Sequence, residues 1–433
     1  MKSFKDKKSN RLFLSSLESL AEDKTKNLEN ELHQVRNKKI LEKRFKINNN
    51  YVNWSNWRQF NAIEKNDKNR KYVFDKFINK TEIISPIIEK RFNRITDIYY
   101  KEGKINPLQG YLENEGITYT RLKDFIKEIA EKAKKPFSEK ILQISKKILN
   151  RNPEYYDDFY YFRNIVFNDI SHKFIEIDPI QHVTEILKDL KMDVKNISFD
   201  TKNRKNKYPS PICFFIDIPN DIRILYKEES PYFNFQGCYH ETGHAMHAIS
   251  IDSKLKYEDK YHIPMGITEI FSIFLERLTR NKKYLEKKIG ITDGKILERI
   301  VELNNFMELF FITFYSANSL TKMEFWTEKL SMDKTSYFYS KMIKKYTGIN
   351  MPGEYWMLHH IMPESIMYVP SYLLAAVRAF ELERKIMERF GEEWWNEEGT
   401  GKFLKNIMKE GAKINLDEFS KLDTKQYLGE IIR

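Results

Sequence analysis

Residues 240–244, His-Glu-Thr-Gly-His, combine two histidines and a glutamate at spacings that suit metal-assisted hydrolysis. In a helix, positions i and i+4 lie one turn apart on the same face, so His240 and His244 could bind one metal ion together. Glu241 lies about a quarter turn from His240, where its carboxylate could act as general base on a metal-bound water without being a ligand. The spacing therefore predicts a hydrolytic site that uses one zinc ion per chain.

A catalytic zinc ion usually has three protein ligands and one open position, so the sequence must supply a third ligand. The metzincin motif does not provide it, because that motif needs a glycine at position 247 and a histidine at position 250. Seven downstream side chains are candidates: His247, Asp252, Glu258, Asp259, His262, Glu269 and Glu276. We favour Glu269 over Glu276, because an inward-facing carboxylate at the start of an apolar segment needs a partner. His247 lies one turn beyond the pair, which favours packing or hydrogen bonding.

The elements that would position these residues can be read from the surrounding pattern. Helical periodicity begins near residue 235, and the small residues Gly243, Ala245 and Ala248 would allow another helix to approach closely. A second helix with mostly apolar residues is expected over residues 266–287. Just ahead of both, within residues 208–228, two apolar runs flank a Pro-Asn-Asp turn signal, which predicts a hairpin or a small sheet.

The rest of the chain predicts a mainly α-helical protein. Apolar residues recur at three and four positions in the segments 11–48, 72–100, 119–135, 138–149, 180–190, 294–319, 333–346 and 371–390. The first 195 residues are therefore expected to be helical throughout. We divide the chain into a helical N-terminal lobe, residues 1–200, and a catalytic zinc-binding lobe, residues 201–433, and this division allows the lobes to be interleaved.

Composition excludes several classes of protein. The 433 residues are 41% apolar and 31% charged, which fits a large core and excludes collagen-like, disordered and disulfide-scaffold chains. The two cysteines, Cys213 and Cys238, match no metal-binding pair and are too few to crosslink a secreted fold, so a reducing cytoplasm is the simplest compartment. We also expect no secretory signal and no membrane span. The predicted location is cytoplasmic.

The chain is basic, with a formal net charge of +12 at pH 7. Such an excess would attract nucleic acid or other acidic partners, but a composition rich in Lys, Asn and Ile also produces it with no functional demand. Because the sequence contains no nucleic-acid-binding motif, we expect no nucleic-acid partner.

Several motifs together resemble the thimet-oligopeptidase and oligoendopeptidase F family of zinc metallopeptidases, and are closer to the oligoendopeptidase F branch. The first is His-Glu-Thr-Gly-His-Ala-Met-His over residues 240–247, followed by Glu-Ile-Phe-Ser-Ile-Phe-Leu-Glu over 269–276, which begins 25 residues after His244. The segments 205–214, 356–363 and 368–372 add to the resemblance. Family members are usually longer, so the N-terminal helical part is expected to be shortened here.

The resemblance implies a role for each site residue. His240, His244 and Glu269 would be the zinc ligands, and Glu241 would be the general base. Tyr368 and Tyr372, with His359 or His360, would face the scissile carbonyl from the opposite wall, where their donors would stabilise the negative charge that develops on its oxygen.

The resemblance also implies a zincin-like helical fold in which two helical lobes surround a deep cleft, with a small β-sheet beside the zinc helix. A deep cleft admits short unstructured peptides and excludes folded proteins, so the expected activity is hydrolysis of internal peptide bonds. Two alternatives are kept: a zinc carboxypeptidase of related helical fold, and a non-catalytic basic binding protein on a peptidase-like fold.

Overall fold

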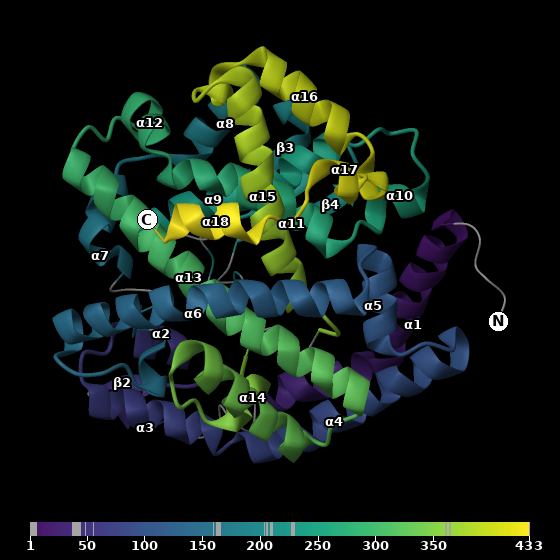
Figure 1. Cartoon of the computed structure of the whole chain (residues 1–433), viewed down its shortest axis with the longest axis vertical. Coiled ribbons are helices and arrows are strands. Elements are labelled where there is room, and N and C mark those ends of the chain that lie inside the picture. The colour runs from purple at the N-terminus through teal and green to yellow at the C-terminus, as the bar shows by residue number, and fades with distance from the viewer. Residues whose placement is uncertain are drawn as a thin grey trace. The chain divides into compact units, whose positions relative to one another are not determined.

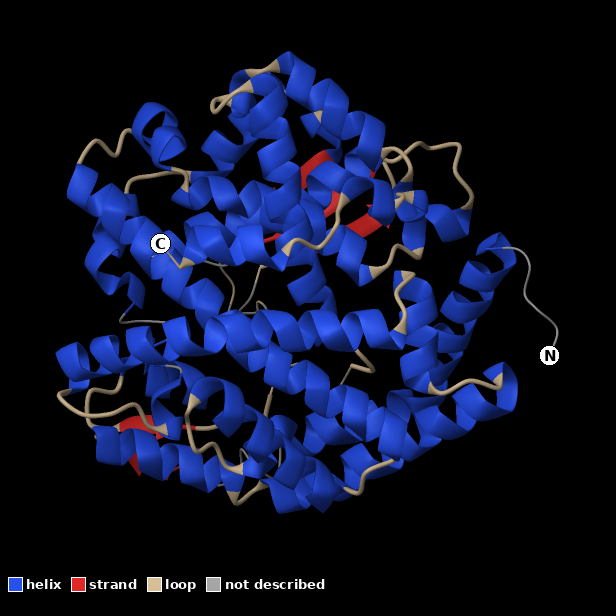
Figure 2. Cartoon of the chain, viewed as in Figure 1, coloured by secondary structure: helices blue, strands red, loops and turns tan. Residues whose placement is uncertain are grey.

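The structure is a computed structural model that confirms a mainly helical protein with a small sheet (Figures 1 and 2). The residues that it describes are 7–36, 45–47, 49–54, 56–158, 160–161, 166–202, 204, 207, 211–226, 230–359, 362 and 365–432. In this part of the chain, no helix combines the length and the apolar character needed to cross a membrane.

The chain forms two compact units, and each contains more than one stretch of sequence. Apart from the last two residues, unit 1 comprises residues 1–166 and 306–370, and unit 2 comprises residues 167–305 and 371–431. The boundaries fall inside three helices, α7 (Val166–Ser171), α13 (Gly294–Glu328) and α15 (Val369–Phe390). The units are thus interleaved, and the expected zinc-binding segment lies within unit 2.

The start of unit 1 differs from the expected helix over residues 11–48. Helix α1 spans Lys7–Gln34, and the strands β1 (Phe45–Ile47) and β2 (Asn50–Val52) form an antiparallel hairpin. Between them Asn49 has a φ of 69°, a left-handed conformation that asparagine tolerates and that ends regular structure. The expectations that the helix reaches residue 48 and that the first 195 residues are all helical are therefore wrong. Residues 37–44 lie outside the described residues.

Helix α6 (Tyr119–Leu149) replaces the two helices expected on either side of Pro136. A proline inside a helix removes one backbone hydrogen bond, but the side chains continue one stripe across it. Four residues at intervals of four are buried along this stripe: Ile129, Ala133, Phe137 and Ile141. Phe137 stacks on Phe306 with ring centroids 6.2 Å apart, so packing on both sides of Pro136 holds the helix continuous.

The remaining helices of unit 1 are short or of medium length. The segment 72–100 forms two helices rather than one, because α3 ends before Asn79 and α4 begins at Thr81. The α-helices among those described are α2 (Trp57–Ile63), α3 (Asp67–Ile78), α4 (Thr81–Ile98), α5 (Pro107–Glu115) and α14 (Met332–Thr347).

Unit 2 contains a three-stranded sheet in the order β3-β5-β4. The predicted hairpin is present as β4 (Ile212–Asp217) and β5 (Asp221–Leu225), which pair antiparallel. Strand β3 (Ile197–Asp200) pairs with β5 in parallel and was not anticipated. The buried side chains of β5, Ile222 and Ile224, pack in one cluster with Ala245 and Ala248. The small sheet therefore lies beside the helix that carries the two histidines, as expected.

The helices of unit 2 include two that carry the candidate site, α9 (Pro231–Ser250) and α11 (Met265–Glu276). Besides the parts of α13 and α15 that belong to this unit, its other described α-helices are α7 (Val166–Ser171), α8 (Pro179–Asp189), α10 (Tyr257–Tyr261), α12 (Lys282–Tyr284), α16 (Glu398–Met408), α17 (Leu416–Phe419) and α18 (Thr424–Ile431). The helix expected over residues 266–287 is wrong in its extent, because α11 ends at Glu276 and a 3₁₀ helix, Arg277–Arg280, follows it.

Candidate metal centre

Helices α9 and α11 approach each other closely at Gly243. A Cβ atom at this position would lie 2.4 Å from the carbonyl oxygen of Phe271 and 2.5 Å from the Cα of Ser272. Only glycine therefore permits this approach, which brings the backbone of α9 against that of α11. Gly243 lies directly before His244 and three residues after His240, so the contact presents both imidazoles to α11.

We expect Gly243→Ala to lower stability and to weaken metal binding together. The added methyl group meets backbone atoms that cannot rotate away, so the two helices must separate, at a cost of about 1–3 kcal/mol. Urea unfolding of the metal-free protein and a zinc titration measure the two effects. Gly294→Ala is the matched control, because a Cβ at Gly294 has no atom within 4 Å. Equal behaviour of the two variants would contradict the proposed close approach.

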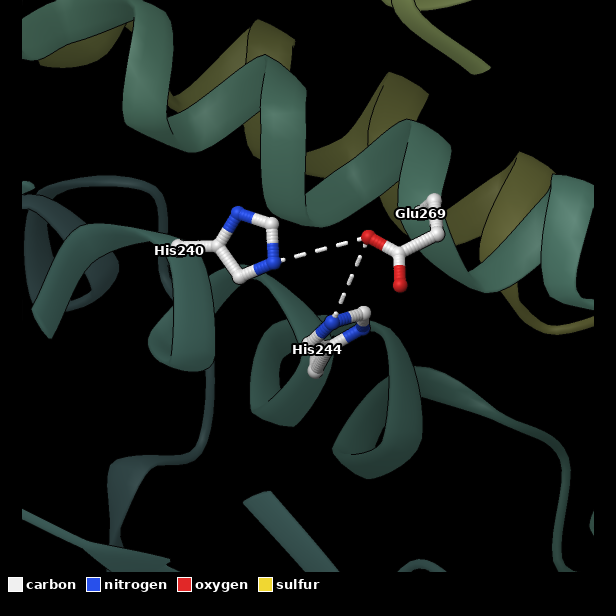
Figure 3. A group of neighbouring side chains, drawn as sticks. All are labelled: His240, His244 and Glu269. Atoms are coloured by element: carbon white, nitrogen blue, oxygen red, sulfur yellow. Dashed lines mark ion pairs between the residues drawn. The ribbon is translucent and has the colours of Figure 1, made fainter. Parts of the chain in front are cut away.

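Three side chains from these helices converge on one point (Figure 3). The Nε2 atoms of His240 and His244 lie 3.4 Å and 3.7 Å from the same oxygen of Glu269, Oε2. The three potential ligand atoms all lie within 4.8 Å of one another. The imidazole rings of His240 and His244 are nearly perpendicular, at 84°, so their Nε2 atoms face the carboxylate from different directions.

The chemistry of this group fits a zinc ion. Two imidazole nitrogens and one carboxylate oxygen are a donor set that zinc accepts, and three ligands leave a fourth position open. The side chain of Glu269 is only 2% exposed, and a carboxylate so deeply buried needs cationic or hydrogen-bonding partners. Among the described residues, this is the group of histidine, cysteine and carboxylate side chains that could hold a metal.

The electrostatics of the two histidines differ because their carboxylate neighbours differ. Burial by itself would lower the pKa of His240, but hydrogen bonds to Glu269 and Glu276 outweigh it and raise the pKa well above its usual value. For His244, burial outweighs the nearby carboxylates and lowers the pKa. His244 therefore favours the neutral form that a metal ligand needs, whereas a metal at His240 must displace a proton.

His247 lies outside the ligand group. Its ring packs against Phe271 with centroids 4.5 Å apart, and only 1% of the residue is exposed. Burial, together with the neighbouring His244, lowers the pKa of His247 to about 3, so it is neutral. Its Nε2 has no hydrogen-bond partner among the described residues. This environment fits the expected packing role.

Glu241, the expected general base, is partly buried on α9 and lies near strand β4. Its carboxylate adds to the burial that raises the pKa of Cys213 well above the usual value of a thiol. One turn before His240, a Cβ at Gly237 would lie 3.0 Å from Pro211, the residue before β4. The beginning of β4 thus lies against the part of α9 that carries Glu241.

The four aromatic residues expected on the opposite wall are distributed over both units. His359 follows a short 3₁₀ helix, Gly353–Met357, and its Nε2 lies 3.4 Å from the amide nitrogen of Asn318. His359 and Tyr368 belong to unit 1, whereas Tyr372 belongs to unit 2 with the metal centre. His360 lies outside the described residues. The roles of all four stay predictions.

Sequence reasoning missed two contacts to the ligand group. Glu276, which was weighed as a rival third ligand, instead lies with Oε2 2.7 Å from Nδ1 of His240. The hydroxyl of Ser272 donates to Oε2 of Glu269 at 3.0 Å. The signal that could have found them is their spacing, because Ser272 and Glu276 lie three and seven residues after Glu269 and hence on its face of α11.

Comparison with known proteins reveals similarity in structure only. No protein-family model and no curated protein sequence matches the chain. The solved structure of PZ peptidase A with an inhibitor is 16% identical, covers 94% of this chain and 76% of its own, and superposes with a TM-score of 0.67.

Two further structures are similar over most of their length. A protein assigned as oligoendopeptidase F from Bacillus anthracis strain Ames is 14% identical, with 94% of this chain and 73% of that chain covered and a TM-score of 0.63. The M32 carboxypeptidase from Deinococcus radiodurans R1 is 13% identical, with 87% and 80% covered and a TM-score of 0.61. The chain therefore has the mainly helical fold that these three peptidases share.

Proposed function

We propose that this chain is a cytoplasmic zinc metallopeptidase of the thimet-oligopeptidase and oligoendopeptidase F kind, which hydrolyses internal bonds of short unstructured peptides. The observation that carries the proposal is the convergence of His240, His244 and Glu269 on one point. The fold supports it, because each of the three similar structures is of a peptidase. The resemblance of the motifs around these residues is the second support.

In the proposed mechanism, His240, His244 and Glu269 hold the zinc ion. When bound, zinc lowers the pKa of water and polarises a carbonyl oxygen. Glu241, next to His240 on α9, accepts the proton of the attacking water and passes it to the leaving amine. Glu241 is partly buried and lies near Cys213 of β4.

The four residues expected on the wall opposite the metal centre complete the proposed mechanism. Tyr368 and Tyr372, with His359 or His360, donate hydrogen bonds to the carbonyl oxygen as its negative charge develops. A donor of this kind contributes about 3–4 kcal/mol to transition-state stabilisation in enzymes where one has been removed.

The experiment that tests the function separates internal cleavage from removal of a terminal residue. We expect a quenched fluorescent peptide to be cut at internal bonds at similar rates whether its C-terminus is amidated or a free acid. A carboxypeptidase must recognise the free terminal carboxylate, so amidation removes its substrate. The products are identified by mass spectrometry, with the chelator-treated protein as control.

The carboxypeptidase alternative has its own support, because one similar structure is a carboxypeptidase. Release of C-terminal residues from the free acid alone would favour this alternative and overturn the proposed endopeptidase activity. Cleavage that continues unchanged after the metal is removed would overturn the metallopeptidase proposal as a whole.

A further inference from the structure

One face of α11 contacts all three residues of the ligand group. Thr268, Ser272 and Glu276 are spaced four residues apart, so they lie one above another along the helix. The backbone of Thr268 is hydrogen-bonded to His244, and the Ser272 hydroxyl to Glu269. Glu276 contacts His240. The same helix that contributes Glu269 thus supports each of the three side chains.

The three contacts differ in how far they can be changed by substitution. The contact from Thr268 comes from the main chain, which every residue retains. Ser272 is neutral and contacts Glu269, a residue on its own helix. Glu276 is the one that is charged, that joins α11 to α9 through a side chain, and that lies 2.7 Å from Nδ1 of a ligand histidine, His240.

The geometry at His240 selects one tautomer of its ring. Nε2 lies 3.4 Å from Oε2 of Glu269 and belongs to the ligand group, whereas Nδ1 lies 2.7 Å from Oε2 of Glu276. A carboxylate only accepts hydrogen bonds, so Nδ1 must carry a proton. In the neutral ring, Nε2 then has its lone pair free and directed at the point where the three ligand atoms converge.

Glu276 gains little from the helix itself. It lies at the C-terminal end of α11, which a 3₁₀ helix continues over Arg277–Arg280, and a carboxylate towards this end of a helix is not stabilised by the helix dipole. Its side chain is 34% exposed, so it is not needed to fill the core either. In the structure, the carboxylate of Glu276 contacts the imidazole ring of His240.

We propose that Glu276 is a positioning residue for zinc: it holds the ring of His240 with the proton on Nδ1 and with Nε2 presented to the ion. The proposal rests on the proposed metal centre but not on which peptide bonds are cut. A carboxylate in this position also makes the imidazole a stronger donor to the metal.

The test compares Glu276→Leu and Glu276→Gln with the wild-type full-length chain, by zinc affinity measured in competition with a chromogenic chelator. Loss of such a partner lowers metal affinity by about 10–100-fold in other zinc sites, which is the loss expected for the leucine variant. The glutamine variant should lose less, because its amide oxygen still accepts from Nδ1. Glu298→Leu, which removes an exposed carboxylate from its pair with Lys282, is the matched control and should bind zinc as the wild type does.

A second measurement reports the tautomer directly and does not depend on activity. In the zinc-loaded protein with ¹⁵N-labelled histidine, the Nδ1 proton of His240 should show the downfield shift of a hydrogen bond to a carboxylate. This signal should move upfield in Glu276→Gln. Wild-type zinc affinity in both Glu276 variants, or an unchanged Nδ1 proton in Glu276→Gln, would overturn the proposal. Zinc binding without peptide cleavage would refute the proposed function and leave this inference standing.

Discussion

Glu241→Gln is expected to remove most peptide hydrolysis while leaving zinc binding intact. The amide has the shape of the carboxylate but cannot accept a proton from water or return it to the leaving amine. A positioned general acid–base residue contributes about 10²–10⁴-fold to the rate, so kcat should fall by a factor in this range. Turnover of the quenched peptide measures the first effect, and elemental analysis of the dialysed protein measures the second.

The control for this variant is the same chemical change at a carboxylate outside the ligand group. Glu258 is such a residue, on α10 of the same unit, and Glu258→Gln should retain both zinc and activity. Similar turnover by Glu241→Gln and the wild type would show that another group moves the proton. Loss of zinc by Glu241→Gln would instead indicate that Glu241 is itself a ligand or holds one in place.

The helices that carry the site could be predicted from the sequence because the relevant information is local. The i, i+4 spacing of His240 and His244 determines their common face once the segment is helical, and α9 extends through both. The same holds for the hairpin of β4 and β5, whose turn residues lie between two apolar runs. In both cases the residues that decide the structure are neighbours in the chain.

Where the prediction failed, a tertiary contact or one turn residue overrode the periodicity. Asn49 lies inside a segment whose apolar spacing still suggests a helix, and it adopts the left-handed conformation that makes the hairpin of β1 and β2 possible. At Pro136 a break was expected but the helix continues, since Phe137 stacks on Phe306, more than 150 residues away. No local rule contains that contact.

The candidate site shows the same limit of local reasoning. Glu269 could be chosen from the apolar character of its segment, but the sequence could not show that Glu276 lies against Nδ1 of His240. That contact depends on how closely α9 and α11 approach, which Gly243 sets. Likewise, strand β3 has only four residues and pairs with β5, which follows later in the chain, so its own sequence does not predict a strand.

Glu269→Gln is expected to abolish zinc binding at concentrations that saturate the wild type. The substitution keeps the volume of a side chain that is 2% exposed, but it replaces the anionic ligand by a neutral amide. If each ligand contributes about a quarter of the ~10–16 kcal/mol measured for structural zinc sites, its loss weakens binding by roughly 100-fold or more. Equilibrium dialysis followed by elemental analysis measures the metal retained.

A thermal shift gives an independent measure of the same loss, because a ligand that binds only the folded state raises its stability with concentration. Zinc should therefore raise the Tm of the wild type and of Glu241→Gln, but not that of Glu269→Gln. The two glutamine substitutions remove the same charge from neighbouring helices. A difference in Tm shift between the two variants therefore reports metal ligation rather than net charge. Retained zinc and an unchanged thermal shift in Glu269→Gln would exclude Glu269 as the third ligand and direct the search to the other downstream candidates, Glu276 among them.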